Sequence, residues 1–230
     1  MSTAAPALRR SVATVALSAV LLGGALTSCS SDSFVAERQS APRPTTTAAV
    51  TTTTLKPDEI LDLARDSIIR VRNTGCGELG VGSAWLAEDG SVITNRHVVE
   101  SHHDIEMLTW DGFDLTPTAV EFSTDLDIAR LHGDWSTAAE LRALPVRSTR
   151  VEPGERISIV GFPEGEKLAV SSGVAVGYGP EPDEPTHEVL KLTTVIKPGN
   201  SGGPAIDVNG QVVGVTFAKE LATDEALVIP

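Results

Sequence analysis

Hydrophobic and polar positions alternate in short runs over most of the chain after residue 57, and Gly, Pro, Asp-Gly or Asn-Gly separate the runs. The runs are rich in Val, Ile and Thr, which at this spacing predicts β-strands. The predicted strands read SIIRVR, GVGSAWLA, SVITN, IEMLTW, IARLHG, RISIVGF, LAVSSGVAVGYG, HEVLKLTTV, QVVGVTF and EALVI. Their number and spacing predict an all-β barrel or sandwich, mainly antiparallel.

Three other segments depart from the strand pattern. KPDEILDLARDS, at 56–67, places Pro57 and two acidic residues in a first turn and Ile60, Leu61 and Ala64 on one face, which predicts a short helix. The acidic, proline-rich stretch 179–188 predicts an exposed loop, and 142–155 predicts a crossover between two halves of the fold.

The first 28 residues have a different pattern, with two arginines, an apolar run and then small residues. The apolar run is too short to span a membrane readily, which needs about 20 apolar residues. Arginines followed by an apolar run and then small residues are typical of an export signal. LTSC, ending at Cys29, resembles the lipobox of bacterial lipoproteins. That resemblance implies a signal peptide at 1–28 and a lipidated Cys29 that anchors the protein, with palmitate among its acyl chains, to the outer face of the cell membrane. The alternative is an ordinary secreted protein with an unmodified cysteine.

A segment without apolar periodicity follows the lipobox. Residues 29–56 contain seven threonines between positions 45 and 54, and too few apolar side chains to offset the entropy of ordering, so we expect a disordered tether. Residues 57–230 are then one domain. After the lipidated residue only Cys76 remains, which excludes an intrachain disulfide. The formal net charge of −13 argues against nucleic acid and anionic headgroups as partners, so membrane contact depends on the lipid.

A serine between glycines, Ser201 in KPGNSGGP before a predicted hairpin, is the candidate nucleophile. Such a serine needs a base, an acid that orients the base, and donors for the oxyanion. Among the five histidines, His97 directly follows a predicted strand and starts a helical turn. Asp125 and Asp127 are candidate acids, and Asp127 lies next to the strand IARL. Singly, each of these residues is more commonly structural, but their combination indicates catalysis.

TNRHVV, DLDIARL and GNSGGP together resemble the histidine, aspartate and serine motifs of trypsin-like (chymotrypsin-fold) serine proteases. The order His, Asp, Ser also distinguishes that family from subtilisins and α/β-hydrolases. The resemblance implies two antiparallel six-stranded β-barrels with the active site between them. It further implies Ser201 as the nucleophile, His97 as the general base, Asp127 as its orienting acid, and the N–H groups of Gly199 and Ser201 as the oxyanion hole.

Several positions depart from the digestive members of that family. Asn200 stands where they have an aspartate that pairs with a new amino terminus, so we expect no activation by such a cut. Asparagine there resembles the bacterial high-temperature-requirement branch, although we expect neither that branch's PDZ domain nor the usual carboxyl-terminal helix in this sequence. The resemblance also implies a substrate pocket set partly by the residue six before the serine, here Val195, with Phe217 and Ala218 near its wall, which we expect to favour small or apolar side chains.

Two functions are therefore compared. The first is a lipid-anchored serine endopeptidase that hydrolyses cell-envelope proteins through an acyl-enzyme, with protein or peptide substrates and no cofactor or metal. The alternative is a weakly active or inactive barrel that binds peptides; the complete set of triad residues argues against it, whereas the expected lack of a carboxyl-terminal helix argues weakly for it. A metal site at His102, His103 and Asp104 is not expected, because adjacent side chains diverge and a solvated loop explains them.

Overall fold

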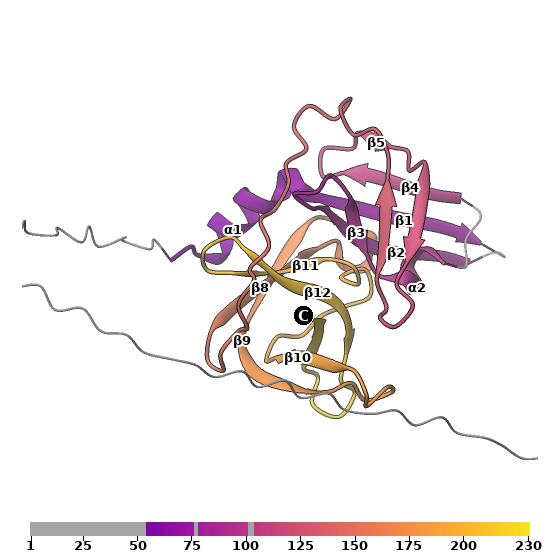
Figure 1. The fold of residues 1–230 in the computed structure, drawn as a ribbon. Coiled ribbons are helices and arrows are strands. Elements are labelled where there is room, and N and C mark those ends of the chain that lie inside the picture. Colours follow the sequence, from indigo (N-terminus) through magenta and orange to yellow (C-terminus); the bar gives the residue numbers. More distant parts are fainter. Residues whose placement is uncertain (1–53, 76–77, 101–103) are drawn as a thin grey trace, which may run out of the picture. The chain divides into compact units, whose positions relative to one another are not determined.

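Two antiparallel β-structures follow one another along the chain, the first drawn in indigo to magenta and the second in orange to yellow (Figure 1). The computed structural model describes residues 54–75, 78–100 and 104–230. Cys29, Cys76, His102 and His103 lie outside the described residues, as does most of the expected tether. No helix within the described ranges is long and apolar enough to cross a membrane.

The expected helix near residue 57 is confirmed. Helix α1 (Pro57–Ala64) begins with Pro57 in its first turn and leads through a 3₁₀ turn at Arg65–Ser67 into the first strand. Its Ile60 and Ala64 are buried, as the helical pattern predicted.

The first β-structure is a seven-stranded sheet in the order β5-β4-β1-β2-β3-β7-β6. Its elements are β1 (Ile68–Gly75), β2 (Glu78–Leu86), β3 (Val92–Thr94), α2 (Arg96–Val99), β4 (Asp104–Thr109), β5 (Asp114–Leu115), β6 (Ala119–Phe122) and β7 (Ala129–His132). The sequence pattern did not predict β5 and β6, because they are two and four residues long and β6 is largely exposed. These short strands form the edges of the sheet.

The second β-structure is a closed barrel in the order β10-β13-β12-β11-β8-β9. Its elements are β8 (Arg156–Gly161), a 3₁₀ turn at Pro163–Gly165, β9 (Ala169–Pro180), β10 (Glu188–Leu192), β11 (Pro204–Asp207), β12 (Val212–Lys219) and β13 (Ala226–Ile229). The hairpin expected after Ser201 is the β11–β12 pair. The all-β, two-part architecture is thus confirmed, with a closed six-stranded barrel and, in place of a second one, a half-barrel sheet of seven strands.

Three apolar clusters fill these structures. One lies within the sheet and includes Val71 and Met107, and a second fills the barrel and includes Ile159 and Leu190. The third contains Ile60, Trp85, Val160 and Ile206, which come from α1, β2, β8 and β11. This shared cluster holds the sheet against the barrel, because burial of such side chains stabilises by roughly 1.5–3 kcal/mol each.

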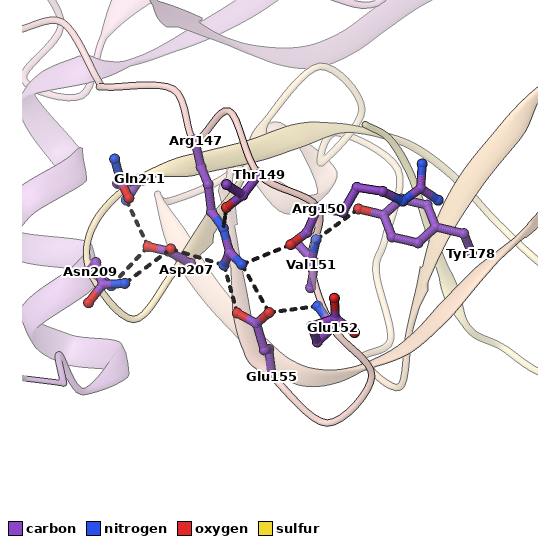
Figure 2. A network of polar contacts seen from close by, with 10 residues as sticks. All are labelled: Arg147, Thr149, Arg150, Val151, Glu152, Glu155, Tyr178, Asp207, Asn209 and Gln211. Atoms are coloured by element: carbon purple, nitrogen blue, oxygen red, sulfur yellow. Dashed lines mark hydrogen bonds and ion pairs between the residues drawn. The ribbon is translucent and has the colours of Figure 1, made fainter.

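The crossover between β7 and β8 is fastened to the barrel by a polar network around Arg147 (Figure 2). The Arg147 guanidinium donates two hydrogen bonds to the Glu155 carboxylate, at 2.6 and 3.0 Å, and lies 3.4 Å from Asp207. Arg150 lies over the ring of Tyr178, 3.7 Å from its centroid. The two hydrogen bonds from Arg147 hold the pKa of the Glu155 carboxyl below the ordinary value.

Candidate active site

His97 is placed by the short helix α2, which directly follows β3. Asn95 precedes this helix with extended backbone angles, and its side-chain amide donates a hydrogen bond to the main-chain oxygen of Asp127 at 2.7 Å. Val98 and Val99 are buried in the apolar cluster of the sheet, which fixes the helical turn. The histidine side chain remains about half exposed, at 47%. The local sequence therefore buries two valines and leaves the imidazole open to a substrate.

Asp127 meets His97 because β3 pairs with β7, opposing Thr94 to Ala129. One carboxylate oxygen of Asp127 lies 2.5 Å from the ring Nδ1 of His97, and the other accepts the main-chain N–H of His97 at 2.9 Å. An ionised carboxylate only accepts hydrogen bonds, so this contact requires the proton on Nδ1. The ring Nε2 is then free to accept a proton.

Ser201 lies in the turn that precedes β11. Its main-chain oxygen accepts the N–H of Ser83 at 2.8 Å, which fixes the turn against β2. Its hydroxyl donates to the main-chain oxygen of Phe217 at 3.3 Å. Within the described ranges no hydrogen bond joins Ser201 to His97. The Ser201 hydroxyl therefore has to leave the Phe217 oxygen before the two side chains act together.

Gly199 gives the serine loop its sharp turn. Its φ is +95°, and a Cβ there would lie 2.3 Å from the main-chain oxygen of Phe162. Both facts exclude a larger residue without a shift of the backbone. The N–H groups of Gly199 and Ser201 donate to no acceptor among the residues that the structure describes. Two free amides on one loop are the donors that a developing oxyanion needs.

Ser83 is a site residue that the sequence analysis did not single out. Its hydroxyl is buried, donates to the main-chain oxygen of Gly199 at 2.7 Å and accepts the N–H of Phe162 at 2.9 Å. It thereby ties the serine loop to the end of β8. The available signal was a polar residue inside a strand pattern, but its partners are more than 75 residues away in sequence.

The three expected substrate-pocket residues lie in two cavities. Val195, 60% exposed, lines a cavity of about 910 Å³ together with Asn200. Phe217 and Ala218 line another, of about 270 Å³, that also contains Glu181 from the acidic loop. No cavity recorded for the described residues contains all three. That loop also borders a cavity of about 380 Å³ lined by Asp127.

The described residues include no group of three or more His, Cys, Asp or Glu side chains that could hold a metal ion. Asp104, from the motif considered for a metal, begins β4. The chemistry that this arrangement supports is proton transfer by an oriented imidazole beside a loop with free amides.

Comparisons with known proteins agree with this geometry. Residues 82–215 match the family described as "Trypsin-like peptidase domain". A putative serine protease HhoB from Synechocystis is 34% identical over 151 residues, covering 61% of this chain and 35% of its own. A probable periplasmic serine endoprotease, DegP-like, from Hahella chejuensis is 31% identical over 140 residues, covering 58% and 29%. The chain thus spans about a third of the length of these curated relatives.

Among solved structures, the active form of the Rv3671c protease from M. tuberculosis superimposes with a TM-score of 0.65 at 23% identity. The match covers 74% of this chain and 78% of that one, and it supports the chymotrypsin-like fold. Because the family match runs over residues 82–215, which is more than half of the 230 residues, the chain belongs to the trypsin-like peptidase family.

Proposed function

We propose that this protein is a serine endopeptidase in which Ser201, His97 and Asp127 act as a catalytic triad. The observation that carries the proposal is the double contact of Asp127 with His97, at 2.5 and 2.9 Å, which leaves the ring Nε2 as an acceptor. The free amides of Gly199 and Ser201 support it, since they are available to a tetrahedral intermediate.

The reaction begins when the Ser201 hydroxyl leaves the Phe217 oxygen and turns to Nε2 of His97. His97 takes the hydroxyl proton while Oγ attacks the scissile carbonyl carbon, and the carbonyl oxygen becomes an oxyanion beside the two amides. The imidazolium, stabilised by Asp127, then gives its proton to the leaving amine and an acyl-enzyme remains. Water attacks this ester, His97 takes a proton from the water, and the proton returns to Ser201 as the acid leaves.

The second candidate is a barrel that binds peptides without cleaving them. It is favoured by the contact of the Ser201 hydroxyl with Phe217 in place of His97. A fluorophosphonate probe separates the two functions, because only an activated serine reacts with it. We expect labelling and peptide hydrolysis in the wild-type protein and neither in Ser201→Ala. Wild-type protein that is folded but neither labelled nor active on a peptide library would leave only the binding function.

The substrates that we propose are proteins or peptides of the cell envelope. The DegP-like relative from Hahella chejuensis is described as periplasmic, which supports export of this chain. We further propose a signal peptide at 1–28, a lipid on Cys29, a tether to residue 56 and a peptidase domain at 57–230. A flexible tether of that length has a root-mean-square reach of ~25–30 Å, which would keep the active site near the membrane.

A further inference from the structure

A second cavity lies beside the serine loop and contains none of the proposed triad residues. Its volume is about 910 Å³, within the usual range of ligand sites. It shares no residue with the cavity lined by Phe217 or with the one lined by Asp127. Asn200 contributes to its wall and is itself 3% exposed, so the cavity reaches the residue directly before the candidate nucleophile.

Cations dominate the lining of this cavity. Its charged residues are Arg70, Arg72, Lys167, Lys197, Glu164 and Glu166. Glu164 forms an ion pair with Lys197, with 3.2 Å between a carboxylate oxygen and the lysine Nζ. Glu166 forms no ion pair with either arginine within the described ranges. A net positive cavity is unexpected in a chain of formal charge −13, and it indicates a place where an anion is bound.

The two arginines are unusually poor in partners. They lie two residues apart on β1, on the face opposite the buried Val71, so both point to the same side of the sheet. Arg70 has no hydrogen bond or ion pair among the residues described, and the nearest carboxylate to Arg72 is that of Glu106 at 3.8 Å. The Nε atoms of both side chains are buried without an acceptor. Unpaired donors of this kind are uncommon, and the Arg72 side chain is 37% exposed, so a ligand in the cavity can reach it.

The electrostatics of Arg70 agree with that geometry. Burial and the neighbouring Arg72 both lower the pKa of the Arg70 guanidinium, and Glu106 only partly opposes them. The guanidinium lies over the ring of Phe162, 5.6 Å from its centroid, which holds it at the edge of the cavity. A carboxylate between the two arginines would supply the missing negative charge and acceptors, since guanidinium groups bind carboxylates through paired N–H donors.

We propose that this cavity binds an acidic peptide segment through carboxylates on Arg70 and Arg72, and that the bound peptide alters the reactivity of Ser201. A peptide fits better than a single small anion because of the volume and because Pro163, Leu168 and Val195 add apolar lining. This control of reactivity rests on the proposed catalytic function, whereas the binding does not.

The cavity wall is joined directly to the serine loop. The N–H of Glu164 donates to the main-chain oxygen of Pro198 at 2.6 Å, one residue before Gly199. Glu164 has a φ of +58°, a backbone conformation that is unfavourable for a residue with a side chain. A peptide bound on Arg70 and Arg72 would also contact this wall, which lines the same cavity, and we expect it to shift the wall and with it the amides of Gly199 and Ser201.

Binding is tested by calorimetry on full-length Ser201→Ala protein, which cannot cleave the probe. The probe is a four-residue glutamate peptide, acetylated and amidated, and its matched control is the corresponding glutamine peptide. We expect the glutamate peptide to bind and the glutamine peptide not to bind. The double variant Arg70→Gln with Arg72→Gln should weaken the affinity for the glutamate peptide by about tenfold or more, which is the effect of losing one charge-assisted hydrogen bond. Arg130→Gln, an exposed arginine on β7 of the same sheet, is the control and should stay within about twofold.

Control of reactivity is tested by the fluorophosphonate labelling rate of wild-type Ser201 with and without the glutamate peptide. We expect the peptide to change this rate in wild type and in Arg130→Gln, and not in the double arginine variant. Equal binding by the double variant, equal displacement by equimolar phosphate, or an unchanged labelling rate on binding would each overturn the proposal. Absence of labelling under every condition, with binding intact, would instead contradict the proposed catalytic function.

Discussion

Replacement of Asp127 by asparagine is the sharpest test of the triad, because the structure fixes both oxygens of this carboxylate. One oxygen faces Nδ1 of His97 and the other accepts the main-chain N–H of the same residue. The main-chain N–H can only donate, so the asparagine oxygen is expected on that side. Its amide nitrogen then faces Nδ1, which has to become an acceptor, and the ring proton moves to Nε2. In that tautomer His97 cannot take the proton of Ser201.

The expected loss follows from the wrong tautomer. The corresponding change in the chymotrypsin-type triad lowers kcat about 10⁴-fold, and at ~1.36 kcal/mol per tenfold this is about 5.4 kcal/mol of activation free energy. The opposite orientation of the asparagine amide does not restore activity, because its NH₂ group would face the main-chain N–H of His97, and two donors cannot form a hydrogen bond. Because asparagine and aspartate are nearly isosteric, we expect folding to be retained.

The assay is kcat for a fluorogenic peptide, together with the fluorophosphonate labelling rate and Tm. Asp125→Asn is the matched control, because Asp125 is exposed and its carboxylate has no hydrogen bond within the described ranges. We expect this control to retain activity within about twofold. A folded Asp127→Asn protein with more than about a tenth of wild-type kcat would refute the reasoning, as would an equal loss in Asp125→Asn.

The remaining predictions concern stability, the serine loop and the anchor. Arg147→Met should lower the free energy of unfolding by about 3 kcal/mol, because it removes the cation beside buried Asp207 and half-buried Glu155, and this should lower Tm by about 6–12 °C. Exposed Arg142→Met is the control and should change Tm by less than about 2 °C in thermal melts. The pKa of Glu155 is depressed from its ordinary 4.5, so the stabilisation by its ion pair is present above that pH and is lost as pH falls through the lower pKa of the folded state. The Tm difference between Arg147→Met and wild type should therefore shrink in acid. A Tm difference that stays constant with pH would contradict the ion pair as its cause. Gly199→Ala should lower kcat by about 10²–10³, since a Cβ displaces the loop amides, and should also lower Tm, because the φ of +95° and the contact with Phe162 strain the loop; unchanged kcat in folded protein would refute the role of the amides. Cys29→Ser should move the protein from the membrane fraction to the soluble fraction without loss of peptide hydrolysis, and retention in the membrane would exclude the lipid anchor.

Most of the fold could be predicted because its signals are local. Alternation of apolar and polar residues marked the long strands, and the proline with two acids marked α1, since each pattern reflects burial of one face of one element. Strands β5 and β6 escaped detection because two to four residues at a sheet edge carry too little of that alternation. The sheet order was not predictable from these patterns, because pairing depends on contacts between segments far apart in the chain.

The sequence by itself determined the candidate triad, since His97, Asp127 and Ser201 each lie in a recognisable motif, and it determined the glycine that the serine loop requires. Only the tertiary structure decided the rest. Pairing of β3 with β7 brings the histidine to the aspartate, and the fold separates Val195 from Phe217 and aligns Arg70 and Arg72 beside Asn200. The physical reason is that a motif specifies residue types along one segment, whereas distances, burial and missing charge partners arise only when distant segments pack together.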